Sequence, residues 1–140
     1  MDMDMHDFDH LVAEGFDTLP VWVQEKISNV ALLTEDEPSE EDRRTQGLED
    51  DETLLGLYKG IPLSARGDGY GVGMTLPDTI TLYRLPILDM AEEEVGENAN
   101  DAVYLARVRQ IIADTIWHEY AHHFGMDEHE VRAREAERGI

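Results

Sequence analysis

The chain of 140 residues is long enough for one compact domain and too short for two of ordinary size. Its 32 acidic residues outnumber its 11 basic ones and give a net charge of −21, a field that repels phosphate groups. We therefore expect neither nucleic acid nor an anionic membrane surface as a partner. The sequence has no cysteine, which excludes disulfides and thiolate metal ligands.

The first seven residues alternate methionine with aspartate and then lose any pattern. We expect residues 1–7 to form a flexible tail and residues 8–140 a single domain. This acidic start lacks the basic segment and the apolar run of a signal peptide, and no apolar stretch of the sequence is long enough to span a membrane. The prediction is a cytoplasmic protein, which we expect to be a monomer.

Two short helices and a strand are predicted for the first part of the domain. Apolar residues at positions 8, 11, 12 and 16 follow a helical period, and Pro20 suits the first turn of a second helix over residues 21–27. Residues 29–34 form an apolar run before an acidic stretch, which indicates a strand. The acidic stretch, residues 35–51, is too charged to be buried, so we predict a solvated loop there.

Two further strands are predicted in the middle of the chain. Residues 54–59 are mostly apolar, and residues 79–85 are rich in β-branched and aromatic side chains and end before Pro86. A glycine-rich stretch at residues 67–73 lacks the lysine of a phosphate-binding loop, so we interpret it as a connection. Residues 91–96 are acidic and predict a short turn.

The longest predicted helix begins at an N-cap, Asn100 or Asp101, and ends at Phe124, directly before Gly125. Apolar residues keep a helical period along this segment, at positions 104, 105, 108, 111, 112, 116 and 120. This pattern identifies the segment as the core helix of the domain. A final charged helix is predicted over residues 130–138, where opposite charges lie one turn apart.

A pattern typical of zinc-dependent peptidases lies at the end of the long helix. His118 and His122 are four residues apart, so their rings share one helix face and offer two nitrogen ligands to one metal ion. Glu119 follows the first of them, where its carboxylate reaches a metal-bound water as a general base. The alternative is an ordinary helix with two surface histidines, since chance gives this five-residue pattern in roughly one such chain in a few hundred.

A catalytic zinc ion needs a third protein ligand and keeps a fourth position for water. After Gly125 ends the helix, the chain turns back, and Glu128 is the candidate for that ligand. The neighbouring His129 is an alternative, and a water molecule that completes the site is another. We predict one zinc ion per chain, although the same ligands accept other divalent metals.

Three stretches of the sequence resemble the bacterial zincin-like metallopeptidases called mini-zincins. They are the run from His118 to Gly125, residues 54–63 and residues 77–83, and the resemblance extends over residues 8–130. It implies an α+β fold in which a small twisted sheet packs on the motif helix, and an edge strand that binds an extended peptide by adding it to the sheet. We assign that edge to one predicted strand: Leu54, Leu55, Gly56, Leu57, Tyr58 and Lys59.

The sequence therefore predicts a zinc-dependent metallopeptidase that acts on extended peptide segments, with no substrate identified. One alternative is a metal-dependent module that binds a peptide without cleaving it, and another is a regulatory protease dedicated to one partner protein. Hydrolysis of RNA is disfavoured, because a net charge of −21 leaves no basic path for a phosphate backbone. Family members usually have Asp at the position of Glu128, whose side chain is one methylene longer, so the third ligand stays open between Glu128, His129 and a water.

Overall fold

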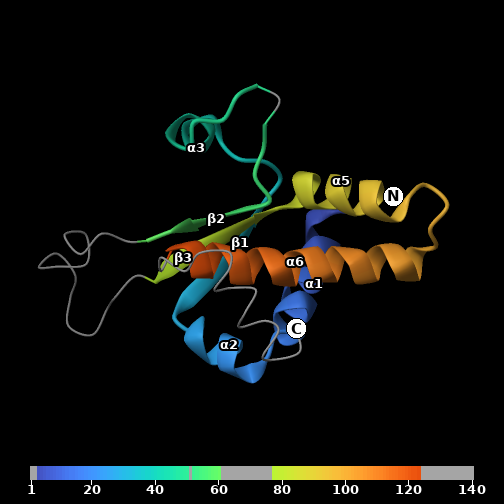
Figure 1. The fold of residues 1–140 in the computed structure, drawn as a ribbon, viewed down its shortest axis with the longest axis horizontal. Helices are drawn as coiled ribbons and strands as arrows, with labels where there is room; N and C mark the ends of the chain where they lie inside the picture. Colours follow the sequence, from blue (N-terminus) through green and yellow to red (C-terminus); the bar gives the residue numbers. More distant parts are fainter. Residues whose placement is uncertain (1–2, 51, 61–76, 124–140) are drawn as a thin grey trace, which may run out of the picture.

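The computed structural model describes residues 3–50, 52–60 and 77–123 of the chain. It contains a three-stranded mixed sheet together with helices, so the predicted α+β fold is confirmed. The longest helix, α6 (Asp101–His123), lies along the sheet at one end and is crossed by α1 (Met5–Asp17) near its middle (Figure 1). No helix within the described ranges has the length and apolar composition needed to cross a membrane.

The first helix begins earlier than its apolar stripe predicts. The side chain of Asp4 accepts a hydrogen bond from the backbone N–H of Asp7 at 2.9 Å and so caps α1, which begins at Met5. Met3, just before this cap, is buried in the hydrophobic core. The helix thus starts inside the predicted tail of residues 1–7. The flexibility of that tail and the domain boundary at residue 8 stay predictions.

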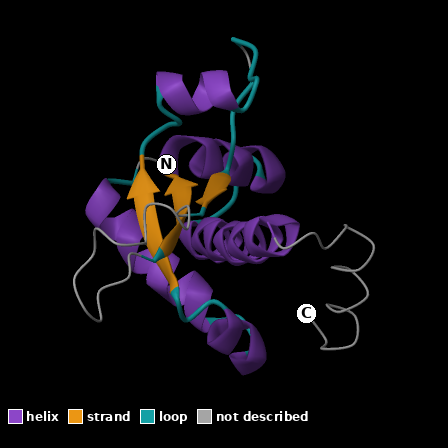
Figure 2. Ribbon diagram, turned by 90° about the vertical axis from the view of Figure 1, so that its left-hand side faces the viewer, coloured by secondary structure: helices purple, strands orange, loops and turns teal. Residues whose placement is uncertain are grey.

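The three predicted strands are confirmed, and they form one sheet (Figure 2). β1 (Val30–Glu35) runs parallel to β3 (Asp78–Tyr83), and β2 (Gly56–Lys59) pairs with the other side of β3 in the antiparallel direction. Ile80 and Leu82 of the central strand are fully buried in the core that the helices share. Among the described strands, β2 therefore lies at an edge of the sheet.

The prediction for residues 84–96 is wrong. The strand ends at Tyr83 rather than at residue 85, and a twelve-residue helix, α5 (Arg84–Val95), replaces the predicted turn at residues 91–96. Pro86 lies in the first turn of this helix, where its nitrogen is not needed as a hydrogen-bond donor, instead of at the edge of a strand. The helix buries one side, formed by Pro86, Ile87, Leu88 and Ala91.

The prediction of a loop throughout residues 35–51 is also wrong, because this stretch contains a short helix, α3 (Glu40–Thr45). The hydroxyl of Ser39 caps it by accepting a hydrogen bond from the backbone N–H of Asp42 at 3.0 Å. Acidic residues fill its first turn and Arg43 and its neighbour fill the last, as the helix dipole favours. Local capping and charge order thus offset the crowding of like charges. Figure 1 shows α3 standing away from α6, beyond β2.

The core lies where α1, α5 and the sheet meet α6. The predicted N-cap of α6 is confirmed at Asn100, whose side chain accepts a hydrogen bond from the backbone N–H of Val103 at 2.9 Å. A Cβ atom at Gly15 would lie 2.9 Å from Cγ2 of Ile112, so the glycine allows α1 to pack directly on α6.

The second predicted helix is confirmed as α2 (Val21–Lys26), which begins after Pro20. The glycine-rich stretch of residues 67–73, the predicted helix end at Gly125 and the predicted helix over residues 130–138 lie outside the described residues.

Candidate metal centre

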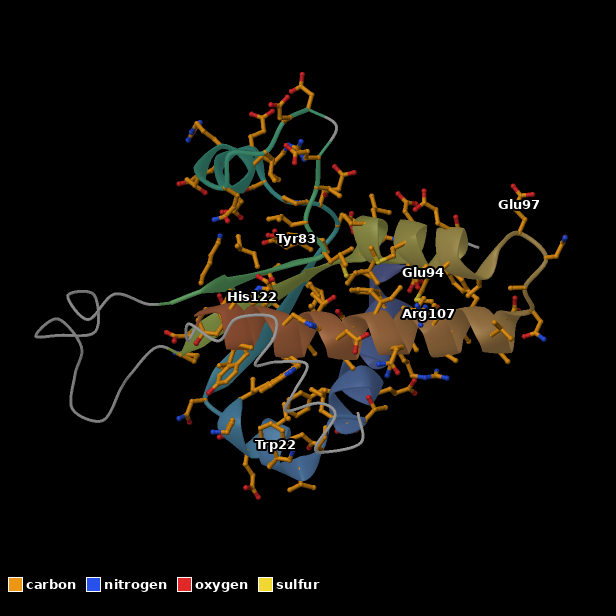
Figure 3. All side chains as sticks on the ribbon, in the orientation of Figure 1. Trp22, Tyr83, Glu94, Glu97, Arg107 and His122 are labelled. Atoms are coloured by element: carbon orange, nitrogen blue, oxygen red, sulfur yellow. The ribbon has the colours of Figure 1, made fainter. Side chains whose placement is uncertain are left out.

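Both histidines of the motif lie in the last turns of α6. The ring centroids of His118 and His122 are 6.1 Å apart, as side chains four residues apart on one helix face should be. His118 is half-buried, and His122 lies near the end of the helix, beside the sheet (Figure 3). The helix therefore brings the two predicted nitrogen ligands together.

The ring of His118 is held by the helix backbone. Its Nδ1 lies 2.7 Å from the carbonyl oxygen of Asp114, one turn earlier. A carbonyl oxygen only accepts hydrogen bonds, so Nδ1 carries the hydrogen and donates it. In the neutral ring, Nε2 then keeps the lone pair that a metal ligand must offer. By the chemistry of its donors, this half of the site fits a zinc ion.

The carboxyl group of Glu119 lies between the motif helix and the edge of the sheet. It is half-buried, and this burial raises its pKa above the ordinary value. A hydrogen bond from the backbone N–H of Tyr58 and the proximity of His122 and His118 lower the pKa, but by less than burial raises it. The raised pKa makes Glu119 a better proton acceptor than an exposed carboxylate, as a general base requires.

The edge strand packs closely on α6 because residue 56 is a glycine. A Cβ atom at Gly56 would lie 2.7 Å from Cγ2 of Thr115 and 3.0 Å from the carbonyl oxygen of Thr81. Any larger residue would therefore push β2 away from α6. The contact brings the residues predicted as the substrate-binding edge next to the motif helix.

A chain of aromatic rings packs beside the motif. Trp117 stacks on Tyr120 with ring centroids 6.2 Å apart, and it meets Trp22 of α2 edge-on at 5.4 Å. Tyr120 in turn lies 6.4 Å from the ring of Tyr58 on β2. These contacts fix α6 between α2 and the sheet around His118. The sequence prediction missed this cluster, although the aromatic residues at position 117, just before the motif, and at position 120, within it, were a signal for it.

The third ligand predicted at Glu128 and its alternative at His129 lie outside the described residues. Within residues 3–50, 52–60 and 77–123, no three His, Asp or Glu side chains are grouped closely enough to hold a metal ion. The complete ligand set therefore stays a prediction, and the described part of the chain supplies two histidines of it.

A groove of about 360 Å³ begins at His118 and Glu119 and runs back along α6. This volume is in the range of small ligand sites. The lining includes Leu54 before β2, Met90 and Glu94 on α5, and Arg107, Ile111 and Asp114 on α6. The α6 wall could have been found from the sequence, because its positions follow a helical period back from His118. The α5 wall could not, because the predicted fold has no helix there.

Tyr83, the last residue of β3, is linked electrostatically to this region. It is fully buried, and its hydroxyl oxygen has no hydrogen-bond partner among the described residues. Burial, and then the negative charges of Asp42, Glu35 and Glu119, raise the pKa of Tyr83 to about 12. The charge of Glu119 thus also affects the pKa of a residue buried inside the sheet.

Comparison with known proteins finds a family and a similar solved structure. A family profile described as "zincin-like metallopeptidase" matches residues 27–138. No curated protein matches the sequence. Among solved structures, a conserved hypothetical protein from T. thermophilus is similar, with 21% identity and a TM-score of 0.45, over 86% of this chain and 94% of that one.

Proposed function

The chain belongs to the zincin-like metallopeptidase family, and from this premise we propose that it is a zinc-dependent peptidase that cleaves extended segments of peptides or proteins. One observation of the described residues carries the proposal furthest: the motif residue Glu119 and Gly56 of the edge strand line the same groove. The candidate base and the strand that would hold a substrate therefore face the same groove, as hydrolysis of a bound peptide requires.

His118 and His122 would hold the zinc ion, with Glu128 as the proposed third ligand. Zinc bound there supplies a Lewis acid that polarises a carbonyl group and lowers the pKa of a water molecule. The hydrogen bond from Nδ1 of His118 to the backbone of Asp114 supports this assignment, because such outer partners orient histidine ligands and select their tautomer.

Glu119 would act as the general base. Its carboxylate accepts a proton from the attacking water and then donates that proton to the leaving amine. The half-buried position of the carboxylate beside His118 and Gly56 in the groove places it where it can reach the water. The upward shift of its pKa supports the role, because a stronger base takes up the proton more readily.

The substrate would lie along the edge formed by Leu54 to Lys59, whose last four residues are β2. In this mode of binding, a peptide in extended conformation pairs its backbone with the edge strand. The close approach of Gly56 to Thr115 supports the assignment, because it keeps such a peptide within reach of Glu119.

The proposal is tested by Glu119→Gln in the zinc-loaded protein. We expect hydrolysis of a peptide library, followed by mass spectrometry, to fall by about a thousandfold. Zinc content should stay at the wild-type level, because the histidines are unchanged. Glu93→Gln is the matched control, since it removes the same charge from an exposed position on α5 and should leave the rate unchanged.

Wild-type hydrolysis by the Glu119→Gln variant would remove Glu119 from the mechanism. A zinc-loaded wild-type protein that binds peptides of the library and cleaves none of them would instead be a metal-dependent binding module.

A further inference from the structure

The groove beside the candidate metal centre combines apolar walls with carboxylates. Leu54, Met90 and Ile111 supply apolar surface, and Met90 is one of the most exposed large apolar side chains among the described residues, at 36%. Asp114 lies one turn of α6 before His118. The groove is therefore suited to a ligand that is both aliphatic and cationic.

The length of the groove indicates a peptide segment rather than a single side chain. Arg107 and His118 both line it and are separated by eleven positions on α6, which corresponds to roughly 16 Å along the helix axis. An extended peptide advances roughly 3.3 Å per residue, so about five residues would span this distance.

The end of the groove far from His118 already holds one cationic group. Nε of Arg107 forms an ion pair with Oε2 of Glu94, and the two side chains are 43% and 35% exposed (Figure 3). The second oxygen of Glu94, Oε1, has no partner among the described residues. A carboxylate accepts several hydrogen bonds, so Glu94 has room for a second cation.

Resting on the proposed peptidase function, we propose that this groove receives the substrate segment next to the cleaved bond and selects for lysine or arginine within it. The aliphatic stems of these residues would lie on Met90 and Ile111, while their charged ends reach Asp114 or Glu94. Among the described residues that line the groove, three carry a carboxylate and one carries a guanidinium, which disfavours acidic peptides. The net charge of −21 steers the same basic peptides toward the protein.

The test measures binding of labelled peptides to the zinc-loaded, full-length Glu119→Gln variant by fluorescence anisotropy. A short serine-alanine peptide carries lysine at regular intervals, and two analogues carry norleucine or glutamate at the same positions. Lysine and norleucine have similar stems, so the ratio of their affinities isolates the charge. We expect the lysine peptide to bind severalfold tighter than the norleucine peptide, and the glutamate peptide to bind weakest.

Three further substitutions distinguish binding in the groove from the general attraction of basic peptides by the net charge of the protein. Glu94→Gln should reduce the lysine-to-norleucine ratio by about threefold, because it removes an acceptor and leaves Arg107 unpaired. Arg107→Gln should raise the ratio, because it removes the competing cation. Glu93→Gln, next to Glu94 and outside the groove lining, should leave the ratio unchanged. Equal affinities for lysine and norleucine would overturn the proposal, as would an equal loss in the Glu93 and Glu94 variants.

The outcome is separable from that of the proposed function. If the zinc-loaded wild-type protein cleaves none of these peptides while the lysine preference depends on Glu94, the groove assignment stands and the peptidase proposal fails. If the protein cleaves the peptides without any lysine preference, the groove assignment fails and the peptidase proposal stands.

Discussion

The chain carries two histidine pairs of the same spacing, one on α1 and one on α6. His6 and His10 on α1 lie with ring centroids 4.8 Å apart, closer than the 6.1 Å between His118 and His122 on α6. An acidic residue, Asp7, even follows the first histidine of the α1 pair. By spacing alone, the α1 pair offers the same two ligands as the α6 pair.

The surroundings of the two pairs differ. On α6 the ring of His118 is oriented by a backbone carbonyl, and Glu119 is half-buried against the edge strand beside a groove. On α1, all three residues are exposed: His6, Asp7 and His10. Any helix therefore supplies ligand spacing, and α6 also orients the ring of His118 through its own backbone, whereas a base of raised pKa requires burial against other elements.

The largest effect on the α6 site is expected from moving the edge strand away from α6. Gly56→Ala places a methyl group 2.7 Å from Cγ2 of Thr115, so we expect it to destabilise the protein by about 1–3 kcal/mol. It should also lower peptidase activity, because the edge strand moves away from Glu119 in the groove that both line. Chemical denaturation and peptide cleavage measure the two effects.

A second substitution serves as the control for this prediction. Thr115→Ser removes Cγ2 and keeps the hydroxyl that donates to the carbonyl oxygen of Ile111 at 2.7 Å. Combined with Gly56→Ala, it should restore part of the stability and activity, and purely additive effects would argue against the contact.

A smaller effect is expected at Tyr83, whose pKa is raised in part by Glu119 and by no residue of the α1 pair. Tyr83→Phe removes a buried hydroxyl without a described partner, so we expect a stabilisation of about 1 kcal/mol at neutral pH. The folded-state pKa of about 12 lies above the ordinary 10.0, so the ionisation of this phenol does not affect the stability of the wild type below pH 10. As the pH rises from 10 through 12, the phenol ionises more readily in the unfolded state, so the wild type loses stability that the Phe variant keeps.

The free energy of unfolding in urea, compared between wild type and Tyr83→Phe at neutral pH and near pH 11, checks both parts of this prediction. A Phe variant that loses as much stability at high pH as the wild type would show that other groups dominate the alkaline transition.

The parts of the fold that depend on local signals could be predicted from the sequence. The period of apolar residues and the cap at Asn100 gave α6, and β-branched residues gave β3. Pro86 misled the prediction, because proline is equally compatible with a strand edge and with the first turn of a helix. The prediction missed α3 because it relied on the high charge of the stretch and did not consider Ser39 as a helix cap.

The candidate site likewise has one part that local sequence signals predict and another that depends on tertiary contacts. The spacing of His118, Glu119 and His122 is local, so the sequence alone identifies it. The groove joins Gly56 to Glu119, residues more than sixty positions apart, and the role of this glycine is visible only when β2 packs on α6. Glu94 enters the groove only because α5 exists, so the motif alone could not have revealed it.

The most direct test of the account is the zinc content of three proteins purified without chelator and dialysed against zinc: the wild type, His118→Ala/His122→Ala and His6→Ala/His10→Ala. Elemental analysis should find about one zinc ion per chain in the wild type and in the α1 variant, and none in the α6 variant, because catalytic zinc sites need at least three protein ligands. Zinc that persists in the α6 variant, or is lost from the α1 variant, would contradict the assignment of the metal centre to α6.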